Sequence, residues 1–334
     1  MNEFPRVSVI IPCRNEESFI GQCLDSIIAN DYPKDKLEII AVDGLSEDGT
    51  KEIIKKYTKI FPNIKLFDNP QRTVPFALNI GIINARGDII VRMDAHNTYE
   101  KDYISKCVKY LKEYDADNVG GISRTLPGDT TQIAQSIAIA LSNPFGVGNA
   151  YFRIGSREPK YVDTVPFGCY KKSVFEKIGL FNENLVRNQD IEFNIRLKNA
   201  GGKILLVPDI ISYYHARPTL KVFAKNNFWN GFWVLYSLRF AKLPFSVRHL
   251  IPFLFVLSLS GGIIFSIVFN PLIYLFIFVA LSYLSLNMFF SFKLSLKYGF
   301  KYFILLILSF MTLHFSYGAG SICGLIRLLT SKIR

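Results

Sequence analysis

The chain has 334 residues, of which 50% are hydrophobic, and a formal net charge of +12. All 27 acidic residues lie at or before Asp209, so the basic residues from Arg217 to Arg334 face no acidic residue. Because this basic part is also strongly apolar, its charge favours an anionic membrane surface and argues against nucleic acid as a partner. Five scattered cysteines without C-x-x-C spacing argue against a disulfide framework and against a thiolate metal site.

Short apolar runs alternate with helical patterns from the N-terminus to Asp94. Strands are predicted at residues 7–12, 37–43, 64–69 and 88–94, and helices at residues 16–30, 50–60 and 75–87. This alternation predicts a Rossmann-like, mostly parallel sheet covered by helices on both faces. In such sheets ligands bind at the carboxyl ends of the strands, and polar clusters fall there at residues 14–16, 43–48 and 94–97.

Beyond residue 120 the pattern is less regular. The stretches 121–130 and 141–160 are glycine-rich, and we expect them to form loops. Residues 162–185 are typical of a strand, a turn and a short helix. A further helix is predicted to start near Asp190 and to end at Gly201, followed by a strand at 203–210.

The C-terminal part divides into two segments. Residues 216–248 mix Lys and Arg with both tryptophans, which predicts an amphipathic interfacial helix; a helix packed on the domain is the alternative. Residues 249–334 form the predicted membrane region. Within it, the 43 consecutive residues from Leu250 to Phe292 contain no Asp, Glu, Lys or Arg. This stretch accommodates two spans with a turn at Asn270-Pro271, because one span needs about 20 apolar residues.

A third apolar run, Tyr302 to Ile326, leaves the number of spans at two or three. With the N-terminal part cytoplasmic, two spans return Lys293, Lys297 and Lys301 to the cytoplasmic side, as the positive-inside bias expects. A third full span would place Arg327, Lys332 and Arg334 outside, which this bias disfavours. The third segment is therefore a span, a re-entrant segment or an interfacial helix.

The fourth predicted strand runs into the polar triplet Asp94-Ala95-His96. A dinucleotide-binding fold would need G-x-G-x-x-G after the first strand, but "PCRNEE" stands there, and no G-x-x-x-x-G-K-[ST] exists in the chain. Phosphate would then be held by a cation or a basic side chain. Asp94 is the predicted metal ligand, whereas His96 either completes the ligand set or meets phosphate directly.

Four stretches resemble successive motifs of family 2 glycosyltransferases with a GT-A fold. They are "VSVIIPCRNEESFIGQCLDSI", "IIAVDGLSEDGT", "ALNIGIINARGDIIVRMDAH" and "GCYKKSVFEKIGLFNENLVRNQDIEFNIRLKNAGGKI", and together they cover roughly residues 5–210. The resemblance is strongest to bacterial exopolysaccharide glucosyltransferases of the succinoglycan ExoA type. It implies a GT-A glycosyltransferase domain at residues 1–215, followed by the interfacial segment and the C-terminal transmembrane helices.

The resemblance also implies roles for individual residues. The nucleotide base would be held by the end of the first strand and by the acidic residue that ends the second: Pro12, Arg14, Asn15, Glu16 and Asp43. In the family's Asp-Asp-Gly-Ser-x-Asp-Gly-Thr motif, this chain has Gly44 and Leu45 at the second and third positions. That departure bears on which nucleotide base the donor site prefers.

Three further positions complete the implied site. Arg72 would approach the donor, and Asp94 with His96 occupies the Asp-x-Asp position that binds Mn²⁺ or Mg²⁺. Asp190 would be the general base, with Gln189 where the family usually has Glu; Glu192 is a second candidate base. An inverting transfer needs one carboxylate to deprotonate the acceptor hydroxyl, and it needs no enzyme nucleophile because diphosphate is a good leaving group. Imidazole suits Mn²⁺ better than Mg²⁺.

The resemblance, together with the apolar C-terminal part, predicts a multi-pass enzyme of the bacterial inner membrane with a cytoplasmic catalytic domain. It would transfer a sugar, with UDP-glucose as the expected donor, to a polyprenyl-diphosphate-linked saccharide in exopolysaccharide synthesis. One alternative is a processive polysaccharide synthase, but the Q-x-x-R-W motif of such enzymes is missing, since neither Trp229 nor Trp233 follows an Arg. The other is a non-catalytic nucleotide-binding scaffold, which would not need both Asp94 and Asp190.

Overall fold

The computed structural model describes residues 4–241 and 246–331 and divides into two compact units. The first unit is Met1–Arg124 with Gly155–Tyr214, and the second is Thr125–Ile154 with His215–Arg334. Residues 125–154 therefore group with the C-terminal segment, whereas residues 1–215 were expected to form one domain. Lys242, Lys332 and Arg334 of the predicted interfacial and membrane segments lie outside the described residues.

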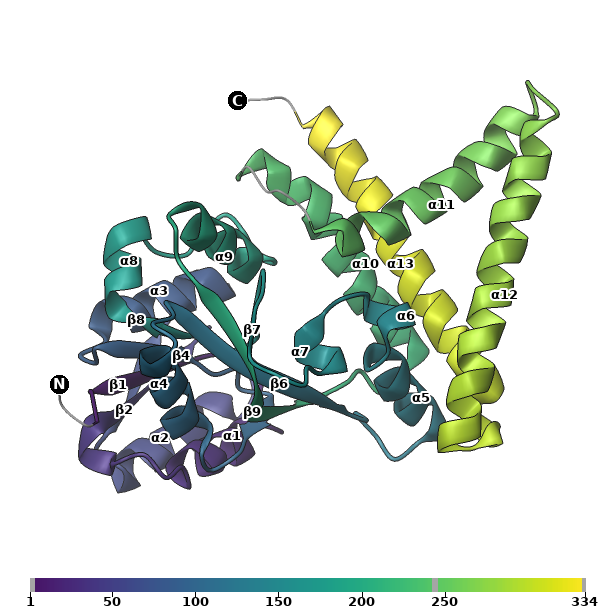
Figure 1. The fold of residues 1–334 in the computed structure, drawn as a ribbon. Helices are drawn as coiled ribbons and strands as arrows, with labels where there is room; N and C mark the ends of the chain where they lie inside the picture. Colours follow the sequence, from purple (N-terminus) through teal and green to yellow (C-terminus); the bar gives the residue numbers. More distant parts are fainter. Residues whose placement is uncertain (1–3, 242–245, 332–334) are drawn as a thin grey trace. The chain divides into compact units, whose positions relative to one another are not determined.

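The first unit is built around one mixed sheet (Figure 1). Within the described residues it has nine strands: β1 (Val7–Cys13), β2 (Leu37–Asp43), β3 (Ile64–Asp68), β4 (Ile89–Arg92), β5 (Asn97–Tyr99), β6 (Asn118–Leu126), β7 (Lys160–Tyr161), β8 (Cys169–Lys171) and β9 (Ile204–His215). Their order is β3-β2-β1-β4-β8-β6-β9-β5, and β7 pairs with β9.

The sheet changes character next to β4. Strands β3, β2, β1 and β4 pair in parallel, as the alternating pattern predicts. The pairs β4–β8, β6–β8, β5–β9 and β7–β9 are antiparallel. The sheet is therefore parallel in its first half, as expected, and antiparallel in its second half. The second half was not predicted because antiparallel strands need no crossover helix and so leave no strand–helix alternation in the sequence.

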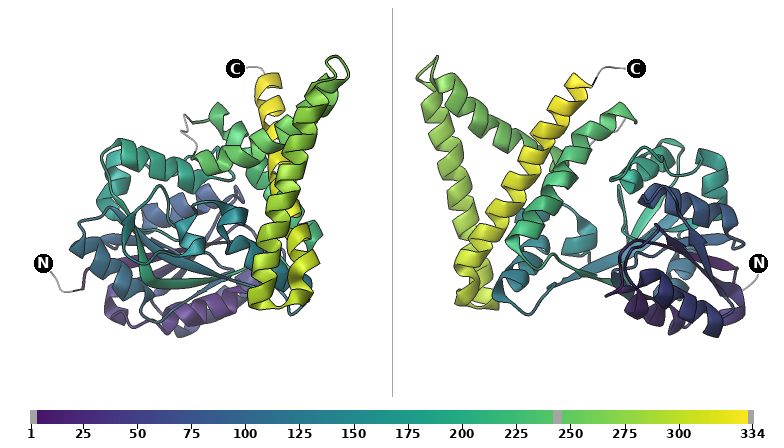
Figure 2. Two further views of the ribbon diagram at one scale, coloured as in Figure 1. Left: turned by 45° about the vertical axis from the view of Figure 1, so that its right-hand side comes forward. Right: turned by 180° about the vertical axis from the view of Figure 1, so that it is seen from behind.

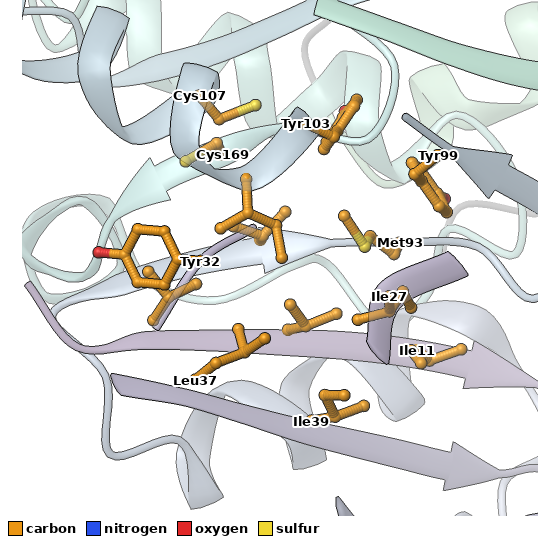
Figure 3. Close-up of a cluster of buried hydrophobic side chains, with 14 of the residues drawn as sticks. Ile11, Ile27, Tyr32, Leu37, Ile39, Met93, Tyr99, Tyr103, Cys107 and Cys169 are labelled. Carbon is orange, nitrogen blue, oxygen red and sulfur yellow. The ribbon is translucent and has the colours of Figure 1, made fainter. Parts of the chain in front are cut away.

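The helices of the parallel half follow the sequence pattern closely. They are α1 (Ile20–Ile28), α2 (Thr50–Ile60) and α3 (Val74–Asn84), and α4 (Tyr103–Glu113) follows β5. Helix α2 and strand β2 have the predicted bounds, whereas α3 ends at Asn84 before the expected Gly87. Figure 3 shows Ile27 of α1 among the buried side chains of β1 and β2, such as Ile11 and Ile39. This packing fixes the carboxyl ends of the first strands.

Two helices lie between β8 and β9, namely α8 (Lys172–Ile178) and α9 (Gln189–Asn199). The expected stop of α9 at Gly201 is present: Gly201 has φ +81 and its N–H donates to the carbonyl of Lys198 at 2.9 Å. This backbone conformation is easy for glycine and strained for other residues. At the other end, Asn188 has φ 62 and places Asp190 in the first turn.

The second unit consists of helices. Three of the described helical segments are long and apolar enough to cross a membrane: Val247–Ser266, Leu272–Tyr298 and Phe300–Thr330. They contain α11 (Val247–Ser266), α12 (Leu272–Tyr298) and α13 (Phe303–Thr330). The expected turn at Asn270-Pro271 lies between α11 and α12, and α13 is one continuous helix rather than a broken re-entrant segment. Figure 2 shows α11 and α12 joining at an end that lies away from α13.

Helix α10 (Leu220–Tyr236) packs along α13 at very short range. A β-carbon at Gly231 would lie 2.0 Å from the carbonyl oxygen of Tyr317, and one at Gly320 would lie 1.9 Å from that of Phe228. Only glycine permits this approach of two helix backbones. The predicted amphipathic segment is thus a helix that packs on the third apolar helix of its own unit.

The expectation of loops at 121–130 and 141–160 was wrong in part, and no element was predicted between them. Residues 118–126 form β6, and the following segment forms α5 (Gln132–Leu141), α6 (Pro144–Val147) and α7 (Tyr151–Ile154). Ser136 of α5 lies 3.0 Å from the hydroxyl of Ser309, and the Phe145 ring stacks on Phe290 at 4.7 Å. Helix α5 therefore packs on α13, and Phe145 of α6 packs on α12 and α13. Six of the ten residues of α5 are buried.

Candidate active site

A pocket of about 140 Å³ opens at the carboxyl ends of β1, β2, β3 and β4 in the first unit. Six of the residues singled out from the sequence line it: Pro12, Arg14, Glu16, Arg72, Asp94 and His96. The other lining residues are Cys13, Gly44, Asn69, Thr73, Val74 and Ala77. Residues at the ends of four strands, β1 to β4, thus meet in one place, as expected for a parallel half-sheet.

Asn15 and Asp43 support the wall of this pocket. The Asp43 carboxylate is fully buried and accepts hydrogen bonds from the backbone N–H and the hydroxyl of Ser46, at 3.0 and 2.5 Å. Asn15 has φ 55, and its side-chain oxygen accepts from the N–H of Glu47 at 2.9 Å. Both residues therefore hold the 44–47 turn against the end of β1, and neither is among the side chains that line the pocket.

Arg72 projects from a tight turn between β3 and α3. Its φ is 59, and its N–H donates to the carbonyl of Asn69 at 3.1 Å. The guanidinium lies 3.5 Å from a Glu47 carboxylate oxygen in an exposed pair that contributes little to stability. Arg72 and the exposed Arg14 are the cations of the pocket, and a guanidinium can bind phosphate oxygens in a forked arrangement.

Asp94 is held rigidly just after β4. Nε and Nη2 of Arg92 donate to its two carboxylate oxygens at 2.8 and 3.1 Å. The Asp94 N–H donates to the buried Tyr99 hydroxyl at 2.8 Å. Burial by itself would raise the pKa of Asp94, but the charge and hydrogen bonds of Arg92, with a smaller effect of His96, hold it below its usual range. Asp94 is therefore a fixed carboxylate that remains charged.

His96 lies beside Glu16 and Asp94. Its Nδ1 is 3.3 Å from Oε1 of Glu16, and its ring meets Tyr214 edge-on at 6.3 Å. Across residues 4–241 and 246–331, no group of three or more His, Cys, Asp or Glu side chains could hold a metal ion. The Arg92 fork still leaves a lone pair on each Asp94 oxygen. Asp94 and His96 fit a two-ligand site that phosphate oxygens would complete, as divalent ions in such sites often require.

Asp190 lies at the start of α9, outside the residues that line the pocket. One of its carboxylate oxygens accepts from the N–H of Ile191 at 2.9 Å. Burial by itself would lower the pKa of Arg92. The charge and hydrogen bonds of Asp94, with a smaller effect of the charge of Asp190, outweigh burial and raise this pKa above its ordinary value.

Glu192, the second candidate base, has a different environment. Its carboxylate is buried and forms a fork with Arg196, at 2.6 Å from Nε and 2.9 Å from Nη2. Arg196 also donates to the carbonyls of Ile178 and Leu180. This arrangement ties α9 to the end of α8, which is a structural task.

Sequence reasoning overlooked Arg92 and Tyr99. A signal was present for Arg92, because a charge inside the apolar strand "IIVRMD" needs a partner when the strand is buried. Tyr99 gave no such signal, because its hydroxyl reaches the N–H of Asp94 only once β5 has folded beside that residue.

Comparison with known proteins agrees with these features. The family described as "Glycosyl transferase family 2" matches residues 8–179. A dolichyl N-acetyl-alpha-D-glucosaminyl phosphate 3-beta-D-2,3-diacetamido-2,3-dideoxy-beta-D-glucuronosyltransferase of Methanococcus voltae is 32% identical over 266 residues, which are 77% of this chain and 81% of that protein. The succinoglycan biosynthesis protein ExoA of Rhizobium meliloti (strain 1021) is 29% identical over 214 residues, 64% of each chain.

Solved structures show the same fold at lower identity. The mannosyltransferase PcManGT from Pyrobaculum calidifontis, solved in complex with GDP-Man and Mn²⁺, aligns with a TM-score of 0.62 at 19% identity, covering 99% of this chain and 89% of that one. TarS 1–349 of S. aureus aligns with a TM-score of 0.51 at 18% identity, covering 95% and 90%. The chain belongs to glycosyl transferase family 2 and has a GT-A-like fold followed by three apolar helices that could span a membrane.

Proposed function

We propose that this glycosyltransferase is inverting and moves glucose from UDP-glucose to a polyprenyl-diphosphate-linked saccharide, as a step in the synthesis of a bacterial exopolysaccharide. The observation that carries the proposal is the pocket in which Arg14, Arg72, Asp94 and His96 converge at the strand ends. Two guanidinium groups can bind the phosphates of a nucleotide diphosphate, and a fixed carboxylate can bind the divalent ion that accompanies them. The similarity to ExoA supports the polysaccharide product.

The donor would lie with its base near Pro12 and the 44–47 turn, and its diphosphate between Arg72 and Asp94. A Mn²⁺ or Mg²⁺ ion would be held by Asp94 and His96, and the bound ion would neutralise charge on the leaving diphosphate. The presence of GDP-Man and Mn²⁺ in the similar mannosyltransferase structure supports a metal-dependent donor site. Arg14 and Arg72 would hold the phosphate oxygens whether the bound ion is Mn²⁺ or Mg²⁺.

Asp190 would take the proton from the acceptor hydroxyl as that oxygen attacks the anomeric carbon. The first turn of α9 suits this role, because the helix N-terminus stabilises a carboxylate and keeps it ionised. The acceptor oxygen displaces the diphosphate in one step with no covalent enzyme intermediate, so the configuration at the anomeric carbon inverts.

A lipid-linked acceptor is supported by two observations. The second unit has three helices long and apolar enough to cross a membrane, which would keep the enzyme at the surface where such a substrate is confined. The relative from Methanococcus voltae is named for a dolichyl phosphate-linked sugar. We assign donor binding and catalysis to the first unit and membrane attachment, with the catalytic unit in the cytoplasm, to the second.

The test is a transfer assay with membranes that contain the full chain. Radiolabelled UDP-glucose, UDP-N-acetylglucosamine and GDP-mannose are supplied separately, with Mn²⁺ or with EDTA, and the label is followed into the organic phase. We expect transfer from UDP-glucose that EDTA abolishes. Transfer from another donor alone would overturn the assignment of glucose, and label confined to water-soluble products would overturn the lipid acceptor.

A further inference from the structure

Arg92 is the direct partner of Asp94, the carboxylate that the proposed function places against the donor. Its guanidinium forms a fork with Asp94, at 2.8 and 3.1 Å, and the side chains of the pair are only 13% and 18% exposed. The fork therefore holds Asp94 in one orientation at the edge of the pocket.

The backbone explains why the fork is rigid. Residues two apart in an extended chain point to the same side, which places Asp94 beside Arg92 at the end of β4. The N–H of Arg92 donates to the carbonyl of Gly168 at 3.0 Å, next to β8. On the other side of Asp94, Tyr99 accepts from its N–H. Asp94 is thus fixed through both its side chain and its backbone.

The connection towards Asp190 runs through β8. Tyr170 lies opposite Ile90 of β4 in the sheet register, and its ring packs on Phe193 of α9 at 5.4 Å. Because α9 carries Asp190 in its first turn, the position of this carboxylate depends on the same packing. Strand β8 therefore contacts both β4, which carries Arg92, and α9, which carries Asp190.

We propose that Arg92 is a positioning residue for donor binding: its forked pair with Asp94 fixes the carboxylate that meets the donor diphosphate and its ion. This inference rests on the proposed function. Arg92 is not among the residues that line the pocket, so it acts through Asp94 and not by touching the donor.

A merely structural ion pair is the competing explanation, and the chain contains a matched control. Arg196 forms the same kind of fork with Glu192, at 2.6 and 2.9 Å, on α9. Neither residue of that pair lines the pocket. Replacing each arginine by lysine keeps the charge and removes the fork. A general loss of rigidity would affect both variants alike, whereas a positioning role concerns Arg92→Lys alone.

The experiment uses the full chain in detergent and measures the Kd for UDP and for GDP, each with Mn²⁺, by calorimetric titration. Thermal midpoints are recorded for the same samples. The variants are Arg92→Lys, Arg196→Lys, Asp94→Asn and the double variant Arg92→Lys/Asp94→Asn. The double variant decides whether Arg92 acts through Asp94, because residues that act on one contact are not additive.

We expect Arg92→Lys to raise the Kd for the bound nucleotide by about 10-fold or more, the usual effect of losing a partner behind a metal ligand. Arg196→Lys should lower the thermal midpoint and leave that Kd unchanged. In the Asp94→Asn background, Arg92→Lys should have no further effect on Kd. An Arg92→Lys protein that melts earlier yet binds nucleotide as the wild type does would overturn the inference. A wild-type chain that binds neither UDP nor GDP would instead overturn the proposed function.

Discussion

The Nδ1 atom of His96 lies 3.3 Å from Oε1 of Glu16, so an imidazole after β4 meets a carboxylate from the end of β1 inside the pocket. This contact leaves Nε2 as the ring nitrogen for an ion or a phosphate oxygen. It also orients the ring, since a carboxylate partner on one nitrogen fixes which tautomer the other presents.

Replacing His96 by aspartate should therefore change the choice of metal. An oxygen ligand suits Mg²⁺, whereas imidazole suits Mn²⁺. We expect His96→Asp to raise the ratio of activity with Mg²⁺ to activity with Mn²⁺ by about 10-fold, the scale of ligand-sphere changes in metal sites. Initial rates over a concentration series of each ion measure this ratio. Unchanged metal dependence would mean that His96 meets the phosphates and not the ion.

Replacing Asp190 by asparagine should abolish turnover without weakening donor binding. The amide keeps the shape of the side chain but cannot accept the proton, and loss of a general base lowers rates by about 10²- to 10⁴-fold. The measurement pairs kcat for sugar transfer with the Kd for the nucleotide.

Glu192→Gln is the matched control on the same helix. Its carboxylate is engaged by Arg196, so this change should lower thermal stability and preserve turnover by the folded enzyme. If Glu192→Gln abolished transfer while Asp190→Asn retained it, the assignment of the base would have to be reversed.

Asp94 and Asp190 differ in how far their positions could be predicted from the sequence alone. Asp94 follows an apolar run at a predicted strand end, so its position in a site was predictable from local pattern. Asp190 was predicted only through the resemblance, and the fork of Arg92 on Asp94 was not predicted at all. The packing of α9 on the sheet depends on β8 pairing antiparallel between β4 and β6, and a pairing of distant strands leaves no local periodicity.

The helices of residues 125–154 were also not predicted. The stretch from Thr130 to Phe152 contains no Asp, Glu, Lys or Arg, yet the glycine content of 121–130 and 141–160 suggested loops. In the structure Phe145 packs against Phe310 at 4.9 Å, and the Phe145 carbonyl lies 3.0 Å from Nε2 of His314. Most residues of α5 are buried, and a helix that is apolar all round shows no amphipathic stripe, so the absence of charge was the more informative signal.

Acid should remove a specific contribution to stability at Glu38. Burial by itself would raise the pKa of this side chain, but hydrogen bonds from Ser8, from the N–H of Arg86 and from Lys65 bring it below its ordinary value of 4.5. A pKa that is lower in the folded state means stabilisation that is present above pH 4.5 and is lost as the pH falls through the folded pKa.

Thermal midpoints of the wild type and of Glu38→Gln should therefore differ above pH 4.5 and converge well below it. Glu52→Gln is the control, because Glu52 is exposed and lies 4.0 Å from Lys55, where an ion pair contributes little. A difference between wild type and Glu38→Gln that persists unchanged in acid would contradict the assigned hydrogen bonds.

The close packing of α10 on α13 predicts that Gly320 tolerates no side chain. A β-carbon there would lie 1.9 Å from the carbonyl oxygen of Phe228, and a backbone atom cannot move aside as the end of a flexible side chain can. Gly320→Ala should lower the free energy of unfolding by about 1–3 kcal/mol or more, the range found for overpacked interiors. Thermal unfolding in detergent measures this loss.

Gly261→Ala provides the comparison within an apolar helix. Its nearest neighbour would be the Phe265 ring at 3.7 Å, an ordinary contact, and alanine favours a helix over glycine by up to about 1 kcal/mol. This variant should be as stable as the wild type or slightly more so. If Gly320→Ala behaved like Gly261→Ala, α10 would not be in backbone contact with α13, and an independent interfacial helix would become the better description of residues 220–236. A clear loss for Gly320→Ala alone would instead place α10 and α13 in one folded body, so that α10 could not leave α13 without unfolding part of the second unit.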